Sequence, residues 1–86
     1  MKLKKGFIVH KRGDETMLVS AGSGGFNGMV RCNSTAGFVV EQMKKDTTED
    51  ALVAAMLEAF DATPDQATDA VAKVLSQLRE IGALDE

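Results

Sequence analysis

The chain has 86 residues, of which 44% are hydrophobic and 27% charged, with a formal net charge of −3 and a single cysteine. This length predicts one domain, residues 1–86, with a small core. One cysteine excludes an intramolecular disulfide and is typical of a reducing compartment, and no apolar run reaches the roughly 20 residues of a membrane span, so we expect a cytoplasmic protein with no membrane partner.

Charge is divided unevenly along the chain. Residues 1–33 hold six basic and two acidic residues, a net charge of +4, whereas residues 34–86 hold four basic and eleven acidic residues, a net charge of −7. A solvated surface explains any single charge. The division as a whole favours a basic first half that attracts an acidic partner.

The first half of the chain predicts three strands. The β-rich runs Phe7 to Arg12 and Thr16 to Ser20 flank the compact turn Gly13-Asp14-Glu15, which is typical of a hairpin. The Gly-rich segment Ala21 to Gly25 predicts a loop, and Phe26 to Asn33 supplies the third strand. The loop lies between two strands, so it lacks the strand-to-helix setting of a phosphate-binding glycine motif.

Helices are predicted after the strands. The first runs from about Thr35 to Lys45, with Ser34 or Thr35 as its N-cap, and Asp46-Thr47-Thr48 interrupts it. Thr48 caps the second helix, which runs to about Phe60. Both helices carry apolar residues at helical spacing, namely Ala36, Val39, Val40 and Met43 in the first, and Leu52, Val53, Met56, Leu57 and Phe60 in the second.

The third helix has the strongest start signal. In Thr63-Pro64-Asp65-Gln66, the threonine caps, the proline takes the first helical position, and the glutamine completes a capping box. Gly82 suits the left-handed backbone conformation that commonly follows the last turn of a helix. The apolar stripe is Ala67, Val71, Val74, Leu75, Leu78 and Ile81. Three strands followed by three helices predict an α+β fold, specifically a winged helix-turn-helix-like domain with a three-stranded antiparallel sheet.

Catalytic chemistry is scarce in this sequence. There is one histidine and one cysteine, too few for a zinc site of the Cys/His type, so we expect no metal, no cofactor and no enzymatic activity. A Cys32–His10 dyad is formally available. The sequence favours Cys32 as a small core residue and His10 as a strand residue.

Nucleic-acid binding is the main alternative for such a fold, because helix-turn-helix domains often bind DNA. The third helix carries Asp65, Asp69 and Glu80 against Lys73 and Arg79. A helix that enters the major groove should be basic, and this one is not. A small DNA-binding regulator is therefore the second interpretation.

An ordered series of short motifs runs along most of the chain. The members are Gly28-Met29-Val30-Arg31-Cys32-Asn33-Ser34-Thr35-Ala36; Thr48, Asp50 and Leu52; Phe60-Asp61; Pro64, Ala67, Val71, Leu75 and Leu78; and Gly82-Ala83-Leu84. In this order and spacing the series resembles the family of coenzyme PQQ synthesis protein D (PqqD). Cys32, Val40 and Lys45-Asp46 depart from the family's leucine, frequent tryptophan and Asp-Gly. These changes favour a relative outside the PQQ pathway itself.

The resemblance implies that the first motif is the last strand of the sheet and the entry to the first helix. Because Cys32 stands at the family's leucine, we place the face of Val30 and Cys32 inward, with Met29 and Arg31 on the opposite face.

The resemblance also implies a function, that of a non-catalytic recognition element for ribosomally made, modified peptides (a RiPP recognition element). Such a domain holds the leader of a precursor peptide and presents it to a modifying enzyme, often a radical SAM protein. We expect the leader to pair with the edge of the third strand and to lay side chains into a groove beside the third helix. The expected peptide-binding residues are Gly28, Met29, Val30 and Arg31 on the strand, and Ala70, Lys73, Val74 and Gln77 on the helix.

Two further expectations concern this groove. Lys73 and Arg31 on opposite walls would favour an acidic leader. The alternative to peptide binding is an edge that Arg31 merely blunts, or that a second copy covers in a homodimer.

Overall fold

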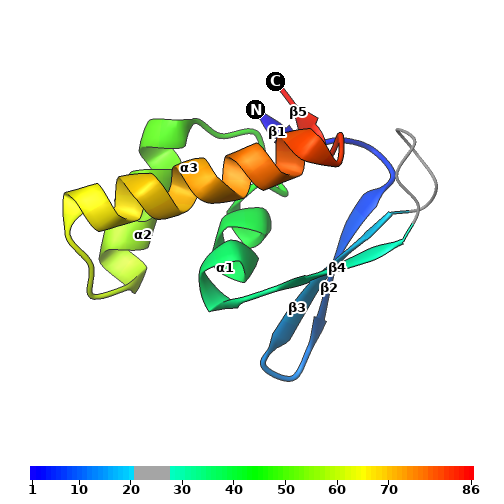
Figure 1. Cartoon of the computed structure of the whole chain (residues 1–86), viewed down its shortest axis with the longest axis horizontal. Helices are drawn as coiled ribbons and strands as arrows, with labels where there is room; N and C mark the ends of the chain where they lie inside the picture. Colours follow the sequence, from blue (N-terminus) through cyan, green and yellow to red (C-terminus); the bar gives the residue numbers. More distant parts are fainter. Residues whose placement is uncertain (21–27) are drawn as a thin grey trace.

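The computed structural model describes residues 1–20 and 28–86. Within them the elements are β1 (Lys2–Leu3), β2 (Phe7–Arg12), β3 (Glu15–Ser20), β4 (Met29–Cys32), α1 (Ser34–Gln42), α2 (Glu49–Ala59), α3 (Pro64–Glu80) and β5 (Leu84–Asp85). The helices lie together and the β2–β3 hairpin extends away from them (Figure 1). The predicted α+β class, a three-stranded antiparallel sheet followed by three helices, is confirmed for these residues. The predicted loop 21–25, and Phe26 and Asn27 of the predicted third strand, lie outside the described residues.

The sheet has the strand order β2-β3-β4, and both neighbouring pairs are antiparallel. The hairpin closes at the pair Arg12 and Glu15. Its turn is therefore Gly13-Asp14 rather than the predicted three residues, and Glu15 belongs to β3. Gly13 has a φ of 62°, the left-handed conformation that glycine takes at the first central position of a type II′ turn.

The two faces of the sheet differ in burial. On β3 the inner residues Thr16, Leu18 and Ser20 are buried, whereas the outer residues between them are only half-buried. On β4 the inner Val30 and Cys32 are half-buried against the core, whereas Met29 and Arg31 are exposed. The predicted orientation of this strand is confirmed.

Side-chain caps set the start of each helix. The Asn33 side-chain oxygen accepts from the Ala36 amide at 2.7 Å, so Asn33 is the N-cap of α1, and the prediction of Ser34 or Thr35 was wrong. Asparagine caps as well as serine, and Asn33 is the first extended residue after β4. The helix also ends at Gln42, earlier than the predicted Lys45.

The caps of α2 and α3 are as predicted. The Thr48 hydroxyl accepts from the Ala51 amide at 3.1 Å. Thr63 and Gln66 form the reciprocal capping box, with side chain-to-amide distances of 3.2 Å and 3.0 Å. Gly82 follows α3 with a φ of 71°.

The core fills the space between the inner face of the sheet and the helices. Its most deeply buried large side chains are Leu18, Val39, Val40, Met43, Leu52, Val71 and Leu75. Phe38 and Phe60 add an edge-to-face ring contact between α1 and the end of α2, with centroids 5.3 Å apart. In the described part of the chain, no helix is long and apolar enough to cross a membrane.

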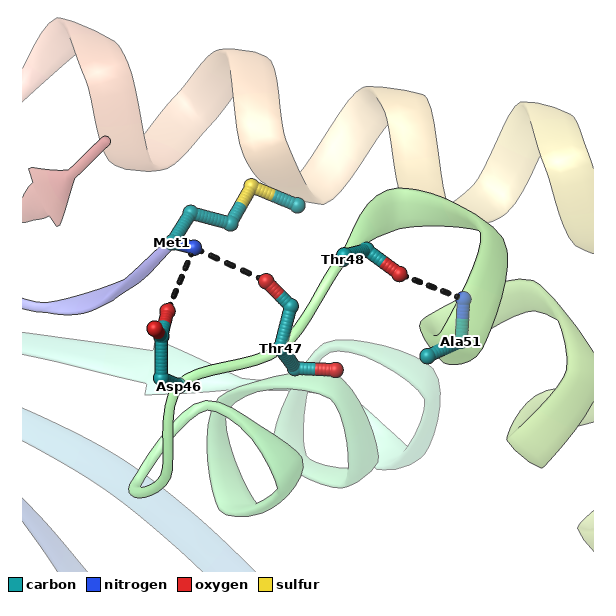
Figure 2. A network of polar contacts seen from close by, with 5 residues as sticks. All are labelled: Met1, Asp46, Thr47, Thr48 and Ala51. Carbon is teal, nitrogen blue, oxygen red and sulfur yellow. Dashed lines mark hydrogen bonds and ion pairs between the residues drawn. The ribbon is translucent and has the colours of Figure 1, made fainter.

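The two ends of the described chain pair with each other as β1 and β5, in the register Lys2 with Asp85. Sequence patterning did not predict these short strands. The Met1 amino group donates to the Asp46 carboxylate at 2.6 Å and to the Thr47 carbonyl oxygen at 2.8 Å, which joins β1 to the α1–α2 connection (Figure 2). The Leu3 amide adds a bond of 3.1 Å to the Met43 carbonyl oxygen.

Candidate functional site

A groove runs between β4 and α3, with α1 as its floor. One part is a pocket of about 300 Å³, and the adjoining part is a pocket of about 270 Å³. Ala36, Val74 and Gln77 line both pockets, so the two form one continuous groove. The first pocket is lined by Leu18, Val30, Arg31, Cys32, Ala36, Val40, Val74, Gln77, Leu78, Glu80 and Ile81.

The wall formed by β4 is a sheet edge, because in the described residues no strand pairs with its outer side. The Ser20 amide donates to the Gly28 carbonyl oxygen at 2.9 Å, which fixes Gly28 as a hydrogen-bonded position of the ladder. Hydrogen-bonded and non-hydrogen-bonded pairs alternate in an antiparallel ladder. By this alternation the amides and carbonyls of Met29 and Arg31 point away from β3, toward the open edge.

The structure brings most of the predicted site residues together. Val30 and Arg31 from β4 line the first pocket together with Val74 and Gln77 from α3, and the second pocket is lined by Asn33, Thr35, Ala36, Asp69, Ala70, Lys73, Val74 and Gln77. Gly28 and Met29 line neither pocket. Gly28 stands at the start of β4, and the Met29 side chain lies on the outer face with 57% of its surface exposed.

Several groove residues were missed from the sequence. Cys32 could have been included, because it shares the inner face with Val30. Ala36 and Val40 were assigned only to the helical core stripe, yet both also form the floor. Alternation and helical spacing indicate a buried face, but only the packing of α1 against β4 shows that these residues also border a groove.

The charges on the groove rim are mixed. Arg31 and Glu80 line the first pocket, and Lys73 and Asp69 line the second. Arg31 also lies 3.5 Å from the Glu15 carboxylate, and both side chains are largely exposed. In the described residues Lys73 makes no ion pair. The expectation of an acidic leader therefore rests on two cations that share the rim with two acids.

Cys32 and His10 do not form a dyad. Cys32 is on the inner face of β4, and His10 is exposed on β2, with β3 between the two strands. Burial raises the pKa of the Cys32 thiol, which keeps it protonated and a poor nucleophile at neutral pH. Within residues 1–20 and 28–86, no three His, Cys, Asp or Glu side chains gather in a way that could hold a metal ion.

Comparison with known proteins identifies the family. Residues 14–84 match the family described as Coenzyme PQQ synthesis protein D (PqqD). The chain belongs to the PqqD family. The match covers β4, all three helices and therefore the whole groove between them. The family resemblance derived from the sequence motifs is confirmed.

Solved structures share the fold of this PqqD-family chain. TbiB1 in complex with the TbiA(beta) leader peptide superposes with a TM-score of 0.83 at 13% identity, over 99% of this chain and 95% of that chain. Lasso peptide synthetase B1 complexed with the leader peptide gives a TM-score of 0.76 at 17% identity, over 95% of this chain and 93% of that chain. No curated protein matches the chain.

Proposed function

We propose that this PqqD-family domain is a non-catalytic adaptor that holds the leader of a ribosomally made precursor peptide and presents it to a modifying enzyme of the radical SAM class. The observation that carries this proposal is the open edge of β4 beside an apolar groove. Solved neighbours of the same fold are complexes with leader peptides, which supports a peptide as the ligand.

The leader would bind as an additional strand. Its backbone would pair with the outward amides and carbonyls of Met29 and Arg31, which gives affinity for many sequences. Its side chains that face inward would enter the groove against Val30, Val74 and Gln77, and these contacts would give selectivity. Gly28 would let the peptide approach the start of β4 without a side chain in the way, and Ala70 and Lys73 would line the far end.

DNA binding is less well supported. The exposed surface of α3 carries Asp65, Asp69 and Glu80, and the Arg79 guanidinium already pairs with Glu86 at 3.0 Å. Lys73 is then the one remaining cation on the helix among the described residues. Phosphate neutralisation needs several unpaired cations.

The test is peptide binding to edge variants. The probes are synthetic peptides encoded by short reading frames next to the gene, measured by calorimetry. Met29→Pro and Arg31→Pro each remove an outward amide and should weaken binding about tenfold or more, because one strand hydrogen bond and its neighbours are lost.

Lys11→Pro is the matched control. By the same alternation Lys11 has an outward amide on the opposite edge of the sheet, on β2. This variant should bind the leader like the parent. Unchanged affinity in folded Met29→Pro and Arg31→Pro variants would refute the proposal, and a dimer that dissociates in these variants would instead assign the edge to a second copy.

A further inference from the structure

A second concave surface lies at the other edge of the sheet. A pocket of about 640 Å³ is formed between β1 and β2, away from the groove at β4. It is lined by Lys2, Leu3, Lys4, Lys5, Phe7, Val9, Lys44 and Asp85, and we call it the lysine pocket. The proposed leader site uses none of these residues.

The charge of the lysine pocket is strongly one-sided. Four of its lining residues are lysines, all exposed, and one is an acid. Lys44 pairs with Glu41 at 3.2 Å. In the part of the chain that the structure describes, Lys2, Lys4 and Lys5 make no ion pair. Four lysines against one acid, Asp85, leave the hollow with a positive charge that attracts an acidic ligand.

The floor and the adjacent strand indicate that this ligand is a polypeptide. The floor is apolar, formed by Leu3, Phe7 and Val9. In the described residues no strand pairs with the outer side of β2, and the ladder alternation points the backbone groups of Val9 and Lys11 outward. Backbone amides and carbonyls that point outward along a strand edge can form hydrogen bonds with another extended chain.

The outer face next to this edge is also apolar and open. Ile8 is 58% exposed and pairs in register with Val19 of β3, which in turn pairs with Met29 of β4. A chain added at β2 would alternate its side chains between the two faces. Acidic residues would enter the lysine pocket, and apolar residues would extend the row that begins at Ile8.

We propose that the β2 edge and the lysine pocket bind an extended segment of alternating acidic and apolar residues from the modifying enzyme. The identity of that partner rests on the proposed function. β3 lies between the two edges, so leader and enzyme segment bind without competing, and the sheet joins them as one five-stranded unit.

The test uses a defined probe. A synthetic peptide of alternating Glu and Val, about eight residues long, is long enough to pair along all 6 residues of β2. It should shift the backbone NMR signals of residues 2–11 and 44, and leave those of residues 70–77 unchanged. A peptide of alternating Lys and Val should not bind. Absence of shifts at millimolar peptide, or shifts centred on β4 and α3, would overturn the proposal.

Charge-reversal variants separate binding at a specific site from a general effect of net charge. The double variant Lys4→Glu and Lys5→Glu should lower the affinity for the acidic peptide about tenfold or more, because two attractive charges become repulsive. Lys45→Glu with Arg79→Glu changes net charge equally at exposed residues outside both β2 and the lysine pocket, and should change affinity less than about twofold. An equal loss of affinity in both double variants would show that net charge alone explains the binding, and would refute a specific site.

Proline variants then separate the two proposals. Lys11→Pro should weaken binding of the acidic peptide and leave binding of the leader unchanged. Met29→Pro should weaken binding of the leader and leave binding of the acidic peptide unchanged. If the leader fails to bind while the acidic peptide binds at β2, the proposed function fails and the β2 surface stands. Duplex DNA that displaces the acidic peptide from Lys4 and Lys5 would reassign the pocket to nucleic acid and overturn the proposal.

Discussion

Gly37→Ala should destabilise the domain, although alanine is the better helix former by about 1 kcal/mol. Gly37 is buried on α1 where the helix crosses β3. A Cβ atom added there would lie 2.8 Å from the Thr16 hydroxyl oxygen and 2.9 Å from the Thr16 Cβ, distances that real Cβ contacts do not reach. Rotation about χ1 can move the hydroxyl but not Cβ, so α1 and β3 must separate.

The net effect follows from two opposing magnitudes. Overpacking of this kind costs about 1–3 kcal/mol, and the helix preference of alanine offsets about 1 kcal/mol of it. We therefore expect a loss of up to about 2 kcal/mol in unfolding free energy, which corresponds to a decrease of up to roughly 16 °C in Tm for a domain of this size. Urea and thermal unfolding followed by circular dichroism measure both quantities.

A double-mutant cycle tests the cause. Thr16→Gly removes both close atoms, so it should recover most of the Gly37→Ala cost, whereas Thr16→Ala keeps the Cβ atom and should recover less. Ala54→Gly, at an exposed site on α2, calibrates the helix preference in this protein. A Gly37→Ala variant more stable than the parent, or a cycle without coupling, would refute the reasoning.

Three further perturbations probe the caps, the core and the chain end. Asn33→Ala should lower the urea midpoint by the equivalent of about 1 kcal/mol, because the Ala36 amide loses its acceptor; an unchanged midpoint would contradict the capping role. Leu75→Ala should cost about 2–5 kcal/mol, since the side chain is fully buried between helices, and a loss below that range would show that the site collapses. The Met1 ammonium lowers the pKa of the Asp46 carboxyl, so this contact stabilises the fold above the usual Asp pKa and is lost as pH falls through the lowered value. Asp46→Asn should therefore lower Tm at neutral pH and match the parent in strong acid.

Local signals made most of the fold predictable. Thr63, Pro64 and Gln66 specify a helix start by chemistry that acts within one turn, and the structure contains that capping box. Asn33 shows the limit of such signals. Three consecutive residues there can cap, and the choice depends on where β4 ends, which pairing with β3 decides.

Long-range contacts were not predictable in the same way. β1 and β5 are two residues each and carry no pattern; they form because Leu3 and Leu84 meet across the whole chain. The groove was predictable in outline from the apolar stripe of α3 and the alternation of β4. Glu80 and Asp69 were not among the predicted groove residues, because no sequence period shows which exposed residues border a cavity.

The pairing of β1 with β5 has a consequence for the order of folding. It closes a loop that contains nearly the entire chain, and the entropy of closing a loop rises with its length. A two-residue ladder gives little enthalpy in return, so this closure comes after the hairpin and helices have already shortened the loop. Its amides should exchange with solvent before those of the core, in a local opening that leaves β4 and α3 in place. Because Lys2 and Leu3 form one wall of the lysine pocket, that surface exists only while the ends of the chain are joined.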